Sequence, residues 1–330
     1  MAGGHGHSHV RRDRCGCART FDGGPMGARA RARRSRVCLA ASAPLDGWNM
    51  AARRRCRFQA TPLWALRCDG ERESKQDVRE ETRWTLEVRD VFKSFGKRTA
   101  VAGVSVSVSS GEVVGVLGPN GSGKSTLFRI AVGRTFPDEG EVTVCSLPSG
   151  ETRDVTHVPL HARAKEGVLY VPQEPSVFRD WTVAENVICA LDLAGVARKD
   201  LQRRTERTLD AFTLSHVADT RSSAVSGGER RRLEIARVLA RFESSSPPPR
   251  FLVVDEPFAG VDPKGVKDLQ ALFMRLASER QLGVLVTDHN VPGVLGVARR
   301  AYVLHEGAVL ASGSPDYLEN HPSVREAYLT

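Results

Sequence analysis

From residue 84 onward, hydrophobic positions recur with two periods that alternate along the chain. The stretch TLEVRDVFKSF (85–95) alternates apolar and polar residues, as a half-buried strand does, and Val-rich runs broken by Gly and Ser follow it. Further apolar runs of strand length lie at 168–171, 251–254, 284–287 and 301–304. Between them, apolar residues recur every three to four positions, as in amphipathic helices, at about 124–133, 161–166, 183–194, 200–213, 227–241 and 264–280.

This order of elements predicts an α/β domain over residues 84–330. Strands that alternate with helices favour a largely parallel sheet that is buried on both faces. The interval 175–240 carries helical patterns and no strand run, so we expect a helical subdomain inserted into the sheet domain. Two Pro/Gly/Ser-rich stretches, CSLPSGETRDV (145–155) and ESSSPPPR (243–250), are expected to be surface insertions.

Residues 1–80 show no sustained period and are expected to form a leader outside the domain. Residues 1–68 contain fourteen Arg, three Asp and neither Lys nor Glu, a formal charge of +11, so the rest of the chain carries −2 of the net +9. The basic charge is therefore no argument that the folded domain binds nucleic acid. The acid-free stretch ARARARRSRVCLAASAP (28–44) is typical of an organelle transit peptide. The alternatives are a start at Met26 or Met50, or a merely disordered tail.

The sequence contains no run of 18 or more apolar residues, and hence no candidate transmembrane helix. A role at a membrane therefore requires a separate membrane protein. Seven cysteines without a CxxC pair argue against both a disulfide framework and a zinc site.

The stretch GPNGSGKST lies between a strand run, VVGVL, and a helical pattern, TLFRIAVG, which is the context of a P-loop, GxxxxGK[ST]. Its glycines let backbone N–H groups surround phosphates, and the following helix N-terminus adds a positive dipole. We expect Lys124 to reach the β- and γ-phosphates of a nucleotide and Ser125 to ligate Mg²⁺. The candidate phosphate-binding residues are Gly118, Pro119, Asn120, Gly121, Ser122, Gly123, Lys124, Ser125 and Thr126.

The stretch FLVVDEP (251–257) is an apolar strand that ends in two acids. Beside a P-loop, Asp255 is suited to the Mg²⁺ coordination sphere, directly or through water. Glu256 is then placed to act as the base that polarises the attacking water. Without the P-loop, a pair of acids at a strand end would be an ordinary surface feature.

The stretch VSGGERRRLEIARVLA (225–240) begins a helix. Ser226 and Glu229 have the S-x-x-E spacing of a capping box. We expect the arginines at 230–232 to form a solvated face with local ion pairs such as Arg230–Glu234. The expected inward stripe consists of Leu233, Ala236 and Ala240.

Taken in order, these motifs resemble those of the nucleotide-binding subunits of ABC transporters, over about residues 85–330. The set is the P-loop, Gln173 in YVPQEP, SGGE at 226–229, DE at 255–256, GVD at 260–262 and His289 in VTDHN. The resemblance implies a P-loop NTPase fold of the ABC type, with a RecA-like core, an antiparallel β region and an inserted helical subdomain.

The resemblance also implies a head-to-tail dimer that sandwiches two ATP molecules with Mg²⁺. Each site would join the P-loop of one subunit to the signature segment of the other, which here is Ser226, Gly227, Gly228 and Glu229. A helix start with two glycines suits an anionic γ-phosphate. Phe95 would stack on adenine, the alternative being a core residue. Gln173 would sense Mg²⁺ and the attacking water, His289 would contact the γ-phosphate, and Asp262 would bridge the dimer.

A finer resemblance is to the lipopolysaccharide-export ATPases (LptB-type) and their relatives among branched-chain amino-acid importers. It rests on the stretches 159–187, 226–240, 255–263 and 282–291. It implies export of a lipid or other amphiphile through separate membrane permease subunits, with import as the alternative. FRDWTVAEN (178–186) would lie beside the groove for a coupling helix of the permease, although Thr182 and Glu185 also form a T-x-x-E capping box.

The leader and the resemblance together predict a protein on the stromal face of the chloroplast inner envelope, or alternatively on the cytoplasmic face of a bacterial inner membrane. The alternative from another class is a soluble ABC ATPase of DNA repair or of ribosomes. A single P-loop and the absence of a long heptad run argue against it. A module that binds ATP without hydrolysing it is disfavoured, because Glu256 and His289 are both present.

Overall fold

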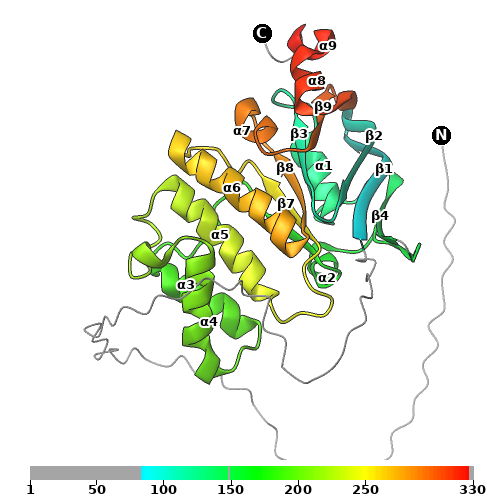
Figure 1. The fold of residues 1–330 in the computed structure, drawn as a ribbon. Coiled ribbons are helices and arrows are strands. Elements are labelled where there is room, and N and C mark those ends of the chain that lie inside the picture. Colours follow the sequence, from blue (N-terminus) through cyan, green and yellow to red (C-terminus); the bar gives the residue numbers. More distant parts are fainter. Residues whose placement is uncertain (1–82, 148, 327–330) are drawn as a thin grey trace, which may run out of the picture. The chain divides into compact units, whose positions relative to one another are not determined.

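The computed structural model describes residues 83–147 and 149–326 (Figure 1). The predictions made for the leader, including the transit peptide, therefore lie outside the described residues.

A six-stranded sheet lies at the centre of the domain, with the strand order β10-β9-β3-β8-β7-β6. Its strands are β3 (Val113–Leu117), β6 (Val168–Val171), β7 (Phe251–Asp255), β8 (Gly283–Thr287), β9 (Arg300–His305) and β10 (Ala308–Gly313). All neighbours pair in parallel except β9 and β10, which are antiparallel. The four predicted strand runs after residue 160 are confirmed to within one residue, and so is the largely parallel sheet.

The two faces of this sheet pack on different partners, because successive side chains of a strand point to opposite sides. On one face, Leu252 and Val254 of β7 join the core cluster that includes the helices of the 183–277 region. On the other face, Phe251 and Val253 join the cluster that includes the helix after the P-loop and a second sheet. Every residue of β3, β7 and β8 is buried, which explains why these strands are continuous apolar runs.

The second sheet is antiparallel and has the order β2-β1-β4-β5. Its strands are β1 (Arg83–Phe95), β2 (Arg98–Ser109), β4 (Glu139–Leu147) and β5 (Thr152–Asp154). The predicted surface insertion at 145–155 contains the end of β4 and all of β5, which pair with each other, for example Cys145 with Thr152. The residues of β5 are exposed, so this stretch lies on the surface as expected, but its backbone extends the sheet.

The helices are α1 (Lys124–Ala131), α2 (Leu160–Lys165), α3 (Val183–Leu193), α4 (Arg198–Ala211), the 3₁₀ turn η1 (Ser215–Val217), α5 (Gly227–Arg241), α6 (Pro263–Arg280), α7 (Val291–Leu295), α8 (Pro315–Asn320) and α9 (Pro322–Val324). The six predicted helices are confirmed to within two residues at each end. Three of them, α3, α4 and α5, contact one another and lie together in Figure 1. The last three helices, α7, α8 and α9, are not predicted from the sequence pattern.

Both predicted capping boxes are confirmed. Thr182 Oγ1 accepts a hydrogen bond from the Glu185 amide at 3.1 Å, and Ser226 Oγ accepts one from the Glu229 amide at 3.2 Å. Each glutamate carboxylate accepts a bond from the cap residue's amide in return. These bonds fix where α3 and α5 begin. The predicted inward stripe of α5 is also confirmed, because Leu233, Ala236 and Ala240 are buried.

The predicted solvated face of arginines on α5 is wrong. Arg231 and Arg232 are each only 7% exposed, and Glu234 pairs with Arg231 instead of Arg230. Arg230 donates to the carbonyl of Val225. The physical reason is that α5 is covered on more than one side, so the side chains after Arg230 turn toward other segments of the domain.

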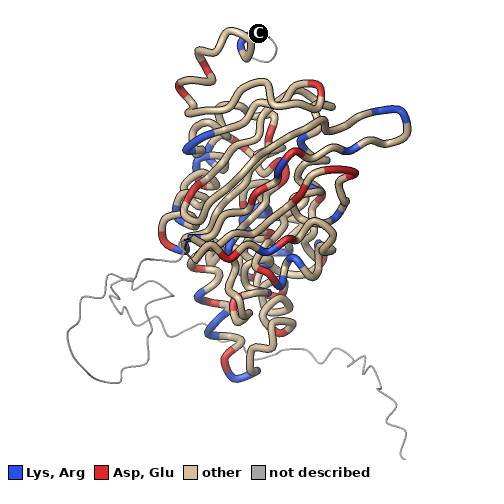
Figure 2. The backbone as a smooth tube through the Cα atoms, turned by 90° about the vertical axis from the view of Figure 1, so that its right-hand side faces the viewer, with Lys and Arg blue, Asp and Glu red and all other residues tan. Residues whose placement is uncertain are grey.

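In the part of the chain that the structure describes, no helix is both long and apolar enough to cross a membrane. Basic and acidic residues are interspersed along the described backbone (Figure 2).

Candidate functional site

The P-loop joins the end of β3 to the start of α1, as the sequence predicts. Gly118 (φ 146°) and Gly123 (φ 102°) both have backbone conformations that L side chains rarely adopt. A Cβ on Gly118 would lie 2.2 Å from the Leu304 carbonyl oxygen, and one on Gly123 would lie 2.3 Å from that of Ala100. These glycines therefore let the loop pack directly against β2 and β9.

Lys124, the first residue of α1, is 6% exposed and points back over the loop. Its Nζ donates to the carbonyls of Gly118 and Pro119 at 2.8 and 2.9 Å. Burial lowers the pKa of this ammonium, although the acids at the ends of β7 and β8 act in the opposite direction. Ser122 Oγ is buried and has no hydrogen-bond partner among the described residues. The loop thus presents a buried cation and an unused polar atom.

Asp255 is the last residue of β7 and is 2% exposed. Its Oδ2 accepts a hydrogen bond from the Tyr170 hydroxyl at 3.3 Å, whereas its Oδ1 is buried without a partner in the described part of the chain. Burial, together with the neighbouring charge of Glu256, raises the pKa of Asp255. Burial and the Asp255 carboxylate in turn raise the pKa of Tyr170 to about 12. An unpaired buried carboxylate oxygen is costly unless a cation or a donor satisfies it.

Glu256 contacts two of the other candidate catalytic residues. Its Oε2 accepts a hydrogen bond from Gln173 Nε2 at 2.7 Å and lies 3.8 Å from Nδ1 of His289. The backbone of Glu256 is left-handed, with φ 48°. These three residues follow β7, β6 and β8, which are adjacent parallel strands, so their carboxyl ends meet at one edge of the sheet. The structure therefore brings together candidates that are up to 116 positions apart in the sequence.

The signature segment lies at the start of α5. Glu229 accepts a hydrogen bond from Ser226 and lies 2.8 Å from Nε2 of His216. Burial alone would raise the pKa of Glu229, but these hydrogen bonds outweigh it and lower the pKa below its ordinary value. Among the described residues, no hydrogen bond or ion pair joins residues 226–229 to residues 118–126.

Packing within one chain also explains why residues 227 and 228 are glycines. A Cβ on Gly227 would lie 2.6 Å from the Gly260 carbonyl oxygen, and one on Gly228 would lie 3.2 Å from the Cα of Gly265. The start of α5 therefore packs closely against the loop that contains Asp262. Asp262 itself is exposed and caps α6, accepting a bond from the Gly265 amide at 3.3 Å.

Phe95, at the end of β1, is 54% exposed, so its alternative reading as a core residue is wrong. Lys93 Nζ lies 5.7 Å from the centre of its ring. Across the hairpin, Phe95 pairs with Arg98, whose Nη2 lies 3.1 Å from the position of a Cβ on Gly121. Arg98 is exposed, and its side chain makes no hydrogen bond or ion pair with another described residue. The hairpin thus presents an aromatic ring and a free cation beside the P-loop.

Three residues at the site are not predicted from the sequence: Arg98, the buried Arg231 and Tyr170. The only signal for Arg98 is a basic residue three positions after Phe95, which is also ordinary for an exposed hairpin. Tyr170 is the single polar side chain in the strand VLYV, directly before the motif that contains Gln173. Its hydroxyl would have been a reasonable candidate for a contact with the neighbouring strand.

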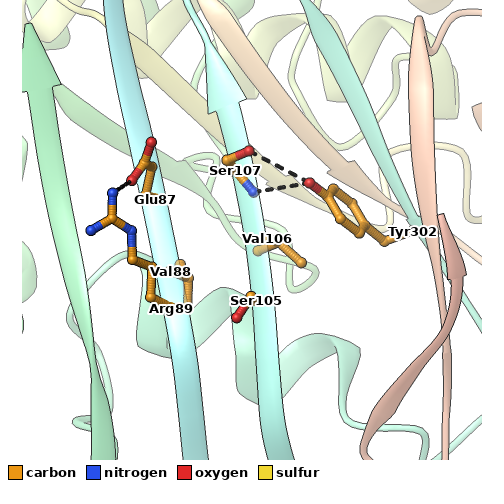
Figure 3. A pocket seen from close by; sticks show the side chains of 7 residues that line it. All are labelled: Glu87, Val88, Arg89, Ser105, Val106, Ser107 and Tyr302. Atoms are coloured by element: carbon orange, nitrogen blue, oxygen red, sulfur yellow. Dashed lines mark hydrogen bonds and ion pairs between the residues drawn. The ribbon is translucent and has the colours of Figure 1, made fainter. Parts of the chain in front are cut away.

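A shallow depression of about 260 Å³ lies beside β1, β2 and β9, outside the nucleotide motifs (Figure 3). In it, Glu87 pairs with Arg89, and the Tyr302 hydroxyl lies 3.3 Å from the amide of Ser107. These side chains satisfy one another. Within the described residues, no group of three or more His, Cys, Asp or Glu side chains could hold a metal ion. A metal at the nucleotide site would thus depend on Asp255, on uncharged side chains such as Ser125 and on the phosphates.

Comparison with known proteins agrees with this geometry. A family model described as ABC transporter matches residues 101–259. The chain is 46% identical over 244 residues to the lipopolysaccharide export system ATP-binding protein LptB of Acidithiobacillus ferridurans, which covers 74% of this chain and 96% of that protein. It is 40% identical over 249 residues to LptB of Escherichia coli (strain K12), with 74% and 97% covered. Among solved structures, it is similar to the ADP conformation of MJ1267, an ATP-binding cassette of an ABC transporter, with a TM-score of 0.63, 28% identity and coverage of 74% of this chain and 98% of that one.

Proposed function

The chain belongs to the family of ABC transporter ATP-binding proteins, and on this premise we propose that two copies of it enclose two ATP molecules. The observation that carries the proposal is the separation of the motifs. The P-loop, Gln173, Glu256 and His289 gather at one edge of the central sheet, whereas residues 226–229 make no polar contact with the P-loop of their own chain. A head-to-tail pair supplies each P-loop with the signature segment of the other subunit.

In this arrangement, several residues of the chain have separate roles in ATP hydrolysis. Glu256 accepts a proton from the water that attacks the γ-phosphorus, while the bond from that phosphorus to the oxygen of the leaving ADP breaks. Gln173 and His289, which contact Glu256, orient the water and the γ-phosphate. Lys124 turns from the loop carbonyls to the β- and γ-phosphates, and Phe95 stacks on adenine.

Mg²⁺, when bound, offsets the negative charge of the phosphates. The residues that fit it are Asp255, whose buried Oδ1 has no partner among the described residues, together with Ser125 and Gln173. Asp262 contributes to the contact between the two subunits.

The test of this mechanism is Glu256→Gln in the full chain with ATP and Mg²⁺. We expect turnover to be lost, while ATP binding persists and the chain sediments as a dimer. Adding Ser226→Arg should return the protein to a monomer that still binds ATP, because the P-loop is intact. Near-normal hydrolysis by Glu256→Gln would show that Glu256 is not the base.

For the transported substrate, we propose export of a lipid or another amphiphile, as in the LptB proteins named above. The support is 40–46% identity over nearly their whole length. Phe178 and Trp181, each 43% exposed just before α3, stack with ring centres 4.6 Å apart, and Arg237 lies over Phe178 at 4.7 Å. These side chains form an exposed aromatic surface suited to the coupling helix of a permease.

Affinity purification from membranes tests this choice, because the permeases that accompany the chain differ between the two kinds of transporter. Export-type permeases support the proposal, whereas permeases of the branched-chain amino-acid type replace it with import. For location, we propose the stromal face of the chloroplast inner envelope, on the composition of residues 1–80 alone. Fusion of those residues to a fluorescent reporter tests it, and a diffuse cytosolic signal excludes it.

A further inference from the structure

Arg231 and Glu234 of α5 form a buried ion pair that none of the nucleotide motifs includes. Arg231 is 7% exposed and Glu234 is 2% exposed, and Nη1 of the arginine lies 2.5 Å from Oε2 of the glutamate. Burying two charges is costly unless their remaining donors and acceptors are also satisfied. The other partners of the pair therefore show what it holds in place.

Those partners belong to the two segments that carry Gln173 and Glu256. Nη2 of Arg231 donates to the carbonyl oxygens of Asp255 and Glu256 at 3.0 and 2.7 Å, and Nη1 donates to that of Pro172 at 2.8 Å. Oε1 of Glu234 accepts a bond from the backbone amide of Ser176 at 3.1 Å. One ion pair on α5 thus fixes the backbone after β6 and the backbone after β7.

The bond to the Glu256 carbonyl bears directly on the candidate base. Glu256 has a left-handed backbone, with φ 48°, which a residue other than glycine keeps only when its surroundings impose it. Its amide donates to the Thr287 carbonyl at 2.8 Å, and its carbonyl accepts from Arg231 at 2.7 Å and, at 3.5 Å, from the Ala259 amide. If the guanidinium moves, the shorter bond to the carbonyl is lost and the carboxylate can leave its place beside Gln173.

We infer that Arg231, held by Glu234, is a positioning residue that links the signature segment to the catalytic carboxylate of the same subunit. This inference rests on the proposed function. The signature segment begins α5, and Arg231 lies within the first turns of that helix. A shift of the helix start, when the partner's γ-phosphate binds there, therefore moves the guanidinium and with it the backbone of Glu256. Hydrolysis at one ATP site then depends on occupation of the other.

The test is Arg231→Lys, with Arg232→Lys as its matched control. Lysine keeps the charge but replaces the planar fork with a single ammonium, which cannot bond the same carbonyls in the same geometry. Arg232 lies on the same helix and is equally buried, but it pairs with Asp268 at 3.1 Å and contacts neither catalytic segment. For Arg231→Lys we expect kcat to fall at least tenfold and KM for ATP to stay within twofold, while Arg232→Lys retains both values.

A second measurement separates positioning from folding. In the Glu256→Gln background, Arg231→Lys should still form the ATP-bound dimer, because the P-loop and signature segment are intact. A kcat within twofold of wild type, an equal loss in Arg232→Lys, or a loss of the ATP-bound dimer would overturn the inference. If Arg231→Lys does not fold, Glu234→Gln replaces it, with the same expected loss of kcat and unchanged KM, and normal kcat overturns the inference. Normal turnover by Glu256→Gln alone would show separately that the proposed function is wrong. In that case the inference about Arg231 also loses its basis.

Discussion

Replacement of Arg163 by Met removes four buried hydrogen bonds, two of which are made to the end of the helix that follows the P-loop. Arg163, on α2, has no exposed surface, and it donates to the carbonyls of Ile130 and Ala131 at 2.6 and 2.7 Å. It also donates to the carbonyls of Thr156 and Val158 at 2.8 and 3.1 Å. Burial lowers its pKa to about 10, so it is still charged at neutral pH and stabilises the negative end of α1.

The magnitude follows from those four bonds. A hydrogen bond that involves a charged group contributes about 1.5–3 kcal/mol net to stability. Removing the buried charge also removes its desolvation cost, which offsets part of the stability lost with the four bonds. Met fills most of the space, so the cavity term is small. We therefore expect the free energy of unfolding to fall by about 3–5 kcal/mol. For a domain of this size that corresponds to a fall in Tm of roughly 10 °C.

Urea and thermal unfolding, followed by circular dichroism, measure this difference. The matched control is Arg153→Met, because Arg153 is 56% exposed and pairs with Glu166 and Glu151 on the surface. Such a pair contributes about 0–1 kcal/mol. If the free energy of unfolding of Arg163→Met lies within about 1 kcal/mol of the wild-type value, as that of the control should, then the four carbonyl bonds do not stabilise the domain by the expected amount.

Three further predictions concern the nucleotide site. Arg98→Gln should weaken ATP binding by about three- to tenfold in the Glu256→Gln background, because a cation beside Gly121 of the P-loop is lost. Lys97→Gln is the control. Equal effects of the two substitutions would refute a specific contact between Arg98 and a phosphate. The lowered pKa of Glu229 means that its ionised form stabilises the fold above its unfolded pKa of about 4.3 and that this contribution is lost as the pH falls through the lower folded value. The difference in Tm between wild type and Glu229→Gln should therefore shrink between about pH 5 and pH 3, and a difference that does not vary with pH would count against it. Gly227→Ala should destabilise the nucleotide-free chain by about 1–3 kcal/mol, because its Cβ meets a backbone carbonyl, and by more than Gly228→Ala; the reverse order would be inconsistent with the packing described.

Much of the domain can be predicted from the sequence, because the central sheet is buried on both faces. Continuous apolar runs of strand length, such as FLVV, favour a central strand. Since parallel strands end at one edge, residues that directly follow such runs lie near one another when the strands are neighbours, as β6, β7 and β8 are. The meeting of Gln173, Glu256 and His289 is the consequence of this rule, although their roles came from the family resemblance.

The environment of the charged residues on α5 could not be predicted in this way. The spacing of Arg231 and Glu234 is that of an ordinary surface ion pair on a helix. Their burial depends on the backbone of residues 172–176 and 255–256, which is brought to the helix only by the tertiary fold. The β4–β5 hairpin was missed for a related reason: three exposed residues, Thr152–Asp154, form a strand because an open edge of β4 is available to them.

The central claim is that each ATP site is built from two subunits, and mixing two inactive variants tests it most directly. Lys124→Met removes the P-loop cation and Ser226→Arg blocks the signature segment, so neither variant alone should hydrolyse ATP. In a mixed dimer, the P-loop of the Ser226→Arg chain meets the intact signature segment of the Lys124→Met chain, and one complete site forms. We expect an equal mixture to be clearly more active than either parent but to recover less than a quarter of the wild-type rate. A quarter is the value for independent sites, since half of the dimers are mixed and each has one of two sites, and here the second site of each mixed dimer cannot bind ATP. Wild-type turnover by Ser226→Arg alone, or a mixture no more active than its parents, would contradict the account.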